Sequence, residues 1–287
     1  MRTDDLLNFY RCDNRTGTIL RALEDKSNKI ELKGVVGSAL ALVAGGVFEN
    51  ELKEGVSKRP HLFVFDDKEK AAYFMNDLEQ ILVENPRPVF LFPRSARVPY
   101  QEEVTENANI AQRAEVLNEI NGGREGSIIV SYPGALSEMV ITQKELSAQT
   151  FSLSLNDSFT LDFLDEVFLE YGFEKVEFVY EPGQYAMRGG IVDVFSYSFD
   201  HPYRVEFFGE EIESIRKFDP VSQLSVSKLT RATIVPNVGN KTLHESQEAF
   251  FSFIPADTVV WMSDVKGCEL GLEKELEKAT SHFERLE

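Results

Sequence analysis

The sequence is poor in cysteine and in long apolar runs. Cys12 and Cys268 are the only cysteines among 287 residues, which argues against a disulfide framework and against a Cys-x-x-Cys metal site. No stretch approaches the roughly 20 apolar residues that a membrane helix needs. The acidic N-terminal stretch has no apolar segment of the kind that a secretory signal requires. We therefore expect a cytoplasmic protein that makes no membrane contact.

Positive charge is scarce as well. The chain has 30 Lys and Arg against 48 Asp and Glu, which gives a formal net charge of −18. Binding to a phosphate backbone needs clustered basic residues, so this balance opposes direct binding to DNA. An acidic chain is suited instead to solubility or to contact with a basic protein surface. We expect any DNA contact to be weak, local or made through a partner.

Residues with catalytic or metal-binding chemistry are few and scattered. The 4 histidines lack the spacing of metal ligands, and no Gly-x-Ser-x-Gly turn that would present a nucleophile is present. We expect no catalytic residue, no metal and no cofactor.

A glycine-rich turn is the one motif that suggests a nucleotide site. Gly34, Gly37 and Ser38 lead into an apolar helical stretch, as in a phosphate-binding loop. Such a loop continues with Gly-Lys-Ser/Thr, whereas this chain has Ala39-Leu40-Ala41. Leu40 cannot neutralise a phosphate, and Ala41 cannot hold magnesium. We interpret residues 29–39 as a short strand and a tight turn before a helix, and we expect no nucleotide to bind there.

The first half of the chain alternates apolar strands with helices. Strands are predicted within 60–67, 87–93 and 126–132, and helices within 1–24, 39–55, 68–82 and 108–121. Asp66 or Asp67 is expected to cap the helix at 68–82. This alternation is typical of a parallel α/β sheet that is covered on both faces.

The pattern changes near residue 146. An amphipathic helix is predicted over 159–173, and from Lys175 to Asp219 the apolar residues recur with a period of two. Gly209-Glu210 is typical of a two-residue type II′ hairpin turn. One helix followed by an antiparallel meander predicts a separate, smaller α+β domain. A further apolar strand, which contains Trp261, and an amphipathic helix follow after residue 249.

The meander also carries a long motif. Its two parts read "GQYAMRGGIVDVF" and "RVEFFGEEIESIRKFD". The residues that fill the motif are Gly183, Tyr185, Arg188, Gly189, Asp193, Phe195, Arg204, Glu206, Phe208, Glu211, Ile212, Arg216 and Asp219. With them, the chain resembles the second domain of the family that contains the excision-repair subunit UvrB and the bacterial transcription-repair coupling factor, Mfd.

The resemblance implies an architecture and a branch of the family. It implies a degenerate P-loop-like α/β domain at 1–145, a UvrB-type domain 2 at 146–237, and a return of the first domain at 238–287. The leucine at position 40 and the short loop from Val98 to Asn107 resemble the coupling factors, because UvrB keeps the lysine and carries a DNA-clamping hairpin. On this interpretation the chain is a fragment of a longer protein.

The resemblance also implies a function in DNA repair. It implies a non-catalytic protein–protein interaction module that binds the DNA damage sensor UvrA in transcription-coupled nucleotide excision repair. The remaining domains of the full-length factor would provide an ATP-dependent DNA translocase and the contacts with RNA polymerase and DNA. The alternative is a UvrB paralogue that still binds or hydrolyses ATP and binds DNA directly.

Four residues of the meander are the candidate partner contacts. Arg188 and Arg204 match motif positions on the face that binds UvrA in the family, with Arg216 and Phe208 as further candidates. Period-two alternation places Arg204, Glu206 and Phe208 on one side of their strand. The alternative is that Arg204 only pairs with an acidic residue on a neighbouring strand, and that Phe208 packs in the core. Gly189-Gly190 is interpreted as a bulge or as a close approach of the preceding helix.

Overall fold

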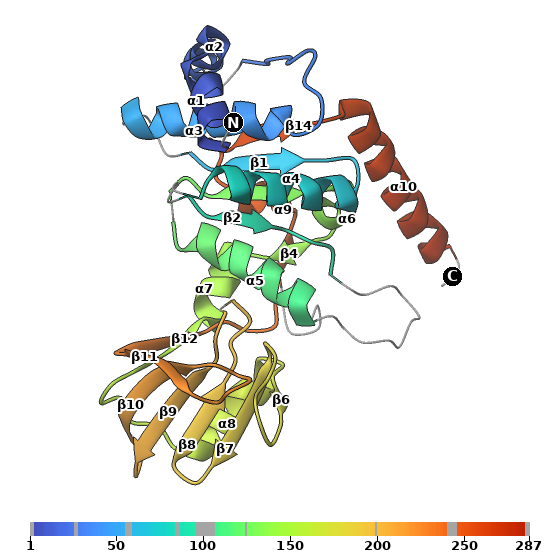
Figure 1. Ribbon diagram of the computed structural model, residues 1–287. Coiled ribbons are helices and arrows are strands. Elements are labelled where there is room, and N and C mark those ends of the chain that lie inside the picture. The colour runs from blue at the N-terminus through green and yellow to red at the C-terminus, as the bar shows by residue number, and fades with distance from the viewer. Residues whose placement is uncertain are drawn as a thin grey trace. The chain divides into compact units, whose positions relative to one another are not determined.

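The structure is a computed structural model that describes residues 3–25, 28–54, 59–83, 87–95, 107–123, 125–198, 200–239 and 246–284. The chain forms two compact units (Figure 1). Unit 1 contains residues 1–92, 123–137 and 254–287, and unit 2 contains residues 93–122 and 138–253. Most of the loop between Val98 and Asn107, whose length favours the coupling factors, lies outside the described residues.

Unit 1 is built on a four-stranded parallel sheet in the order β14-β1-β3-β2. The strands are β1 (His61–Val64), β2 (Val89–Leu91), β3 (Ile128–Ser131) and β14 (Val259–Met262). Every residue of β1 and β3 is buried, as expected for central strands covered on both faces. The predicted parallel sheet is confirmed.

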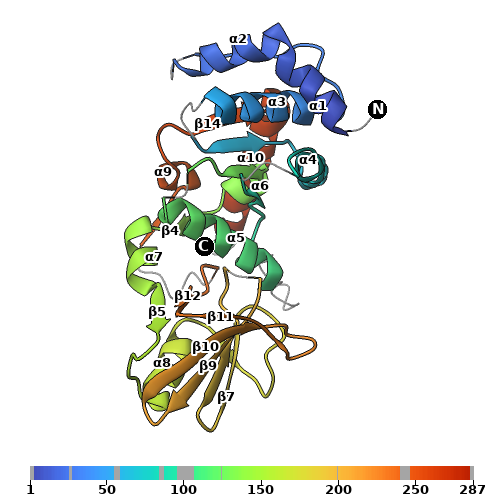
Figure 2. The same cartoon turned by 60° about the vertical axis from the view of Figure 1, so that its left-hand side comes forward.

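The helices of unit 1 predicted within 1–24, 39–55 and 68–82 form there, whereas the short helix at 133–136 is additional and the last helix begins earlier than predicted. The helices are α1 (Thr3–Cys12), α2 (Asn14–Leu23), α3 (Ala39–Glu54), α4 (Lys68–Ile81), α6 (Pro133–Leu136) and α10 (Val265–Phe283). Asp67 caps α4, because its carboxylate accepts a hydrogen bond from the backbone N–H of Lys70 at 2.7 Å. Figures 1 and 2 show α1 lying against α3. Among the described residues, no helix has the length and apolar character to span a membrane.

One predicted strand of unit 1 is wrong. Residues 28–33 form no strand, although the turn that follows them leads into α3 as expected. Within this segment, only Ile30 and Leu32 are apolar, between Lys29, Glu31 and Lys33, and Ile30 is 40% exposed. The segment gains too little apolar burial to be held against the sheet.

Unit 2 is built on a six-stranded sheet in the order β11-β10-β9-β8-β7-β6, antiparallel except for the β6–β7 pair. The strands are β6 (Glu174–Lys175), β7 (Gln184–Arg188), β8 (Ile191–Val194), β9 (Tyr203–Phe208), β10 (Glu211–Phe218) and β11 (Ser225–Leu229). The helices are α5 (Asn107–Asn121), α7 (Gln143–Gln149), α8 (Leu161–Glu170) and α9 (Phe250–Phe253). The predicted helix and meander are both confirmed.

Two short ladders lie at the ends of this sheet-forming segment. β5 (Phe151–Ser154) pairs with β12 (Arg231–Ile234), and β4 (Val140–Ile141) pairs with β13 (Gln247–Glu248). The two strands that precede the six-stranded sheet in sequence are thus hydrogen-bonded to the two strands that follow it.

The chain then returns to the first sheet. β14 pairs in parallel with β1, with Val259 opposite His61. A six-stranded sheet therefore interrupts the parallel sheet in sequence, as the resemblance implies. The boundaries at 145/146 and 237/238 stay a prediction.

Two glycine turns set the register of the meander. Gly209 and Glu210 are the two central residues of the turn between β9 and β10. Gly209 has a positive φ of 68° and Glu210 does not, as a type II′ hairpin requires. Gly189-Gly190 is neither a bulge nor a helix contact. It forms the two-residue turn between β7 and β8, with a φ of 59° at Gly189. A Cβ at Gly190 would lie 2.8 Å from the backbone oxygen of Phe207 on β9.

Candidate protein-interaction face

The sheet of unit 2 has one face covered by α8 and an opposite, open face, part of which is buried where Val179 packs with Ala186, Phe195 and Phe218. On the covered side, Tyr185 of β7 packs against Phe168 of α8, with ring centroids 5.0 Å apart, and donates a hydrogen bond to Asp165 of that helix. On β9, Tyr203, Val205 and Phe207 are buried, and the residues between them are not. The open face therefore carries the alternate residues, which include all four predicted contacts: Arg188, Arg204, Phe208 and Arg216.

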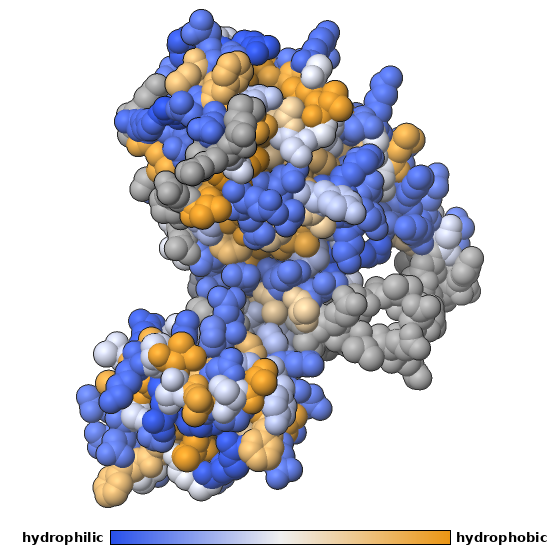
Figure 3. All heavy atoms as spheres, in the orientation of Figure 1, coloured by the Kyte–Doolittle hydropathy of each residue, from blue (hydrophilic) through white to orange (hydrophobic). Residues whose placement is uncertain are grey.

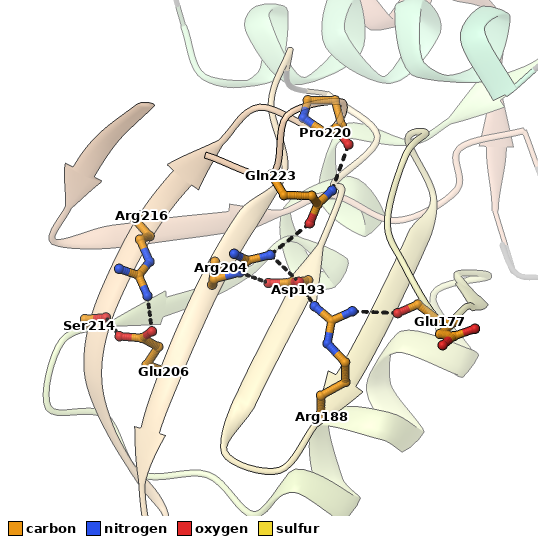
Figure 4. A network of polar contacts seen from close by, with 9 residues as sticks. All are labelled: Glu177, Arg188, Asp193, Arg204, Glu206, Ser214, Arg216, Pro220 and Gln223. Carbon is orange, nitrogen blue, oxygen red and sulfur yellow. Dashed lines mark hydrogen bonds and ion pairs between the residues drawn. The ribbon is translucent and has the colours of Figure 1, made fainter. Parts of the chain in front are cut away.

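Asp193 of β8 lies at the centre of this face (Figure 4). It is directly opposite Arg204 of β9 in the ladder. The two side chains form a bidentate pair, in which Arg204 Nε donates to Oδ1 at 2.7 Å and Arg204 Nη2 donates to Oδ2 at 2.8 Å. This bonding raises the pKa of Arg204 above its ordinary value. Arg204 thus has the cross-strand acidic partner that the alternative interpretation expected.

Arg188 reaches the same carboxylate from β7. Its Nη2 donates to Asp193 Oδ2 at 2.5 Å, and its Nη1 donates to the carbonyl of Glu177 at 2.6 Å. The side chain of Arg188 is 37% exposed, that of Arg204 is 17% exposed and that of Asp193 is 1% exposed. Two guanidinium groups therefore share one buried carboxylate.

Aromatic rings and an amide complete the network. The guanidinium of Arg188 lies 4.9 Å from the ring centre of Phe178, and that of Arg204 lies 4.4 Å from the ring centre of Phe218. Gln223 accepts a hydrogen bond from Arg204 Nη2 at 3.1 Å and donates one to the carbonyl of Pro220 at 2.7 Å (Figure 4). Both arginines are therefore held on several sides.

Arg216 and Phe208 lie in different surroundings on the open face. Arg216 of β10 forms an ion pair with Glu206 of β9, which also accepts a hydrogen bond from the hydroxyl of Ser214 at 2.6 Å (Figure 4). Phe208, at the end of β9, is 81% exposed, so it does not pack in the core. Figure 3 shows apolar residues interspersed with polar ones over the visible surface of unit 2.

Asp193 and Gln223 were not predicted as site residues from the sequence. The available signal for Asp193 was an acidic residue between two valines in an apolar strand, because a buried carboxylate needs a cationic or hydrogen-bonding partner. Gln223 carries no comparable signal in the sequence. Its position depends on the turn between β10 and β11, where it adopts a φ of 60°.

The glycine-rich turn lies in unit 1, before α3. Gly34 and Gly37 have φ values of 76° and 57°, and no atom lies within 4 Å of a Cβ built on either residue. Their role is therefore backbone conformation and not close packing. Ser38 is exposed and Leu40 is half-buried in the first turn of the helix. Because no strand precedes it, this turn lacks the strand–loop–helix frame of a phosphate-binding loop. Among the described residues, no group of three or more His, Cys, Asp or Glu is placed to hold a metal ion.

A second arginine–carboxylate cluster lies inside unit 1. Glu51 of α3 lies 2.7 Å from Arg87 Nη2 and 3.5 Å from His61 Nε2, and all three residues are buried. Trp261 of β14 donates its Nε1–H to His61 Nδ1 at 3.0 Å, which leaves the His61 proton on Nε2, facing Glu51. No local pattern in the sequence indicates this cluster. Trp261 is half-buried, and it stacks on Phe63 at 5.1 Å.

Comparison with known proteins identifies the class of the second unit. Residues 151–239 match the model of the UvrB interaction domain. These residues include the ladder β5–β12, all strands of the six-stranded sheet and the complete open face. The chain thus contains a domain of a protein–protein interaction class.

The comparison then extends to longer proteins. The chain is 27% identical over 233 residues to the transcription-repair-coupling factor of Bacillus subtilis, which covers 81% of this chain and 19% of that protein. It is 29% identical over 213 residues to that of Myxococcus xanthus, which covers 72% of this chain and 17% of that protein. It is also 26% identical over 216 residues to UvrABC system protein B of Thermosipho africanus, which covers 71% of this chain and 32% of that protein. The chain is similar to the two coupling factors over most of its own length and spans about a fifth of theirs.

Proposed function

We propose that this chain is a non-catalytic docking module that recruits the damage sensor UvrA in transcription-coupled nucleotide excision repair. The observation that carries the proposal is the open face of the UvrB interaction domain, where Arg188 and Arg204 surround Asp193 and Phe208 is exposed. In this proposal the module works in the cytoplasm. It contacts UvrA and the remaining domains of a full-length factor, which make the contacts with RNA polymerase and DNA.

The chemistry of the open face is suited to a protein and not to a nucleic acid. From Glu181 to Asp219 the sequence has 4 basic residues against 8 acidic ones, too few for a groove that binds a phosphate backbone. Isolated arginines are suited to bidentate pairing with carboxylates of a partner, and an exposed phenylalanine on the same face provides an apolar anchor. Arginine and aromatic residues are enriched among the residues that dominate binding energy at protein interfaces.

The test is binding to purified UvrA. The parent chain is expected to elute with UvrA from a sizing column, and Arg188→Ala or Arg204→Ala is expected to weaken binding at least about tenfold in calorimetry, the scale of an interface hot spot. Arg231→Ala is the matched control. Arg231 is an exposed arginine of the same unit, but it lies on β12, outside the six-stranded sheet, and bonds Ser152.

The outcomes separate the function from the site. A parent chain that does not elute with UvrA would contradict the function. Binding that survives both arginine substitutions would contradict the site but leave the function standing. A loss with Arg231→Ala equal to that of the two variants would indicate a general charge effect and not a defined face.

In this proposal the glycine-rich turn before α3 does not bind a nucleotide. We expect titration with fluorescent ATP and magnesium to give no signal in the micromolar range, because no lysine follows Gly37 to neutralise the phosphates. Magnesium-dependent binding in that range would favour the nucleotide-binding alternative.

A further inference from the structure

Asp193 divides its single negative charge between two arginines. Its Oδ1 accepts one hydrogen bond from Arg204, and its Oδ2 accepts one from Arg204 and one from Arg188. The carboxylate is buried, so water does not contribute to its solvation. The three charged groups together hold one net positive charge.

A second arginine is not required if the cluster serves stability alone. A buried carboxylate needs one cation and enough hydrogen bonds, which Arg204 already supplies as a bidentate partner. A second guanidinium adds repulsion between like charges and a further desolvation cost. Among the described residues, the other side-chain and backbone acceptors of Arg188 and Arg204 are neutral: the Glu177 carbonyl and the Gln223 amide oxygen. The excess positive charge is therefore available to an anion from outside the chain.

The network also fixes the two arginines before any partner binds. Ordering a long side chain at an interface costs conformational entropy, and a side chain that is already ordered avoids that cost. Arg188 and Arg204 are held by the same carboxylate, by two aromatic rings and by the hydrogen bonds to Glu177 and Gln223. Both retain N–H groups beyond those that these bonds use.

We propose that Asp193 is a positioning residue for partner recognition, which deepens the function proposed above and rests on it. It holds the guanidinium groups of Arg188 and Arg204 side by side, so that a carboxylate on an acidic patch of UvrA meets donors that are already in place. Asp193 does not itself contact the partner, because it is buried between the two arginines (Figure 4).

The test combines Asp193→Asn with the two arginine variants. Asparagine keeps the size of the side chain but cannot accept three charge-assisted hydrogen bonds. Calorimetry with UvrA is expected to show a loss of at least about tenfold for Asp193→Asn, similar to the loss for either arginine. Each variant is measured at a temperature at which circular dichroism shows that it is folded.

A double-mutant cycle supplies a measurement that a purely structural role would not change. In the parent, the effects of Arg188→Ala and Arg204→Ala on binding are expected to be non-additive, because both arginines share one carboxylate. In the Asp193→Asn background the same two effects are expected to be additive. Parent-like affinity of Asp193→Asn, or unchanged non-additivity in that background, overturns the proposal while the UvrA function stands.

Gln223→Ala keeps the proposal testable if Asp193→Asn does not fold. Gln223 lies in a half-exposed turn and makes one hydrogen bond to Arg204, so its removal loosens that arginine without leaving a buried charge. We expect a two- to fivefold loss of UvrA binding, and Gln80→Ala, which alters an exposed glutamine of α4 in unit 1, is expected to cause none. Parent-like affinity of Gln223→Ala in that case overturns the proposal. If the parent does not bind UvrA, it is the proposed function that fails.

Discussion

Each unit of the molecule contains an arginine–carboxylate cluster, and the two clusters have opposite surroundings. In unit 1, Arg87 and Glu51 are both buried, with one cation for one anion, and burial lowers the pKa of the third member, His61, so that it is neutral. In unit 2, Arg188 and Arg204 share Asp193 on an open sheet face. The first cluster is balanced in charge and closed to water, and the second has an unused positive charge at the surface.

This difference in burial and charge predicts that one cluster affects stability and the other affects recognition. Removing one member of a buried pair leaves a charge that nothing solvates, so the first cluster is expected to control the free energy of unfolding. In the second cluster, Arg188 is 37% exposed, and its loss leaves Asp193 still paired with Arg204, so removing Arg188 is expected to cost little stability. The second cluster is therefore expected to control binding and the first to control folding. The following experiments test this division, from the largest expected effect to the smallest.

Arg87→Leu is expected to destabilise unit 1 by about 3–5 kcal/mol, because it leaves the buried carboxylate of Glu51 without a cation. Urea unfolding followed by the fluorescence of Trp261, the only tryptophan of the chain, reports on unit 1. The double variant Glu51→Leu/Arg87→Leu is expected to recover most of the loss, since it removes both charges. Equal losses in the single and double variants would show that packing, and not charge, dominates this site.

The stability of unit 1 is expected to fall as the pH drops below about 6.5. Burial lowers the pKa of His61, despite the opposing effect of Glu51, so the unfolded chain takes up a proton that the folded chain does not. Stability is therefore complete above the pKa of the unfolded histidine and is lost below it, by at most about 1.4 kcal/mol per pH unit. Burial opposes ionisation of Glu51, but His61 and Arg87 outweigh it and lower its pKa, which adds a loss in the same direction at lower pH.

Urea unfolding by tryptophan fluorescence between pH 8 and pH 5 measures this dependence. His61→Phe keeps an aromatic ring beside Phe48 but cannot take up a proton, so its stability is expected to vary less over the same range. An equally steep decline in His61→Phe would assign the acid sensitivity to other groups.

Glu115 is expected to make the stability of unit 2 fall as the pH rises, which is opposite to the effect of His61 in unit 1. Glu115→Gln is expected to remove this dependence. Burial, with smaller effects from Asp200 and Glu119, raises the pKa of Glu115 to about 7. Between about pH 4.5 and 7 the folded chain holds the proton more tightly than the unfolded chain, so stability falls as the pH rises through this window. The substitution is expected to stabilise by about 1 kcal/mol at pH 8, a value reduced for partial exposure, and to change little at pH 4.5.

Thermal unfolding followed by far-ultraviolet circular dichroism at the two pH values measures the effect. Glu166→Gln, which alters an exposed glutamate of α8, is the matched control and is expected to be neutral at both. A stabilisation of equal size at pH 4.5 and pH 8 would show that the charge of Glu115 is not its cause.

Arg216→Ala is expected to have the smallest effect on stability, below about 1 kcal/mol, because its ion pair with Glu206 is partly exposed. Hydrogen exchange of the β9 and β10 amides is expected to be nearly unchanged. A loss as large as that of Arg87→Leu would contradict the expectation that a partly exposed ion pair of unit 2 contributes less to stability than the buried pair of unit 1.

The local pattern of the sequence predicted most of the elements of this fold. The period of two at 203–208 gave the correct division of β9 into a buried and an open side, because burial on one face imposes that alternation. Asp67 was correctly among the residues expected to cap α4, since capping depends on neighbouring residues. The strand predicted at 29–33 was wrong, because a strand also needs a pairing partner and a buried side. The few apolar residues of this segment do not supply a buried side.

The two clusters were beyond local patterns. Arg188, Arg204 and Asp193 meet only because the turn at Gly189-Gly190 sets the register of β7, β8 and β9, and the sequence alone predicted a bulge or a helix contact at these glycines. Glu51 comes from α3, His61 from β1 and Arg87 from the segment before β2, so their meeting depends on packing over long separations in the chain. The roles of the open face in binding stay predictions.

The pairing of the entering and leaving strands affects how the polypeptide folds. β14 completes the first sheet about 200 residues after β1, a separation that on its own implies a large loss of chain entropy and slow folding. Once β4 has paired with β13 and β5 with β12, the residues between β3 and β14 no longer behave as one long flexible loop. The inserted sheet is thus expected to form first during synthesis and to deliver the last strand to its place beside His61.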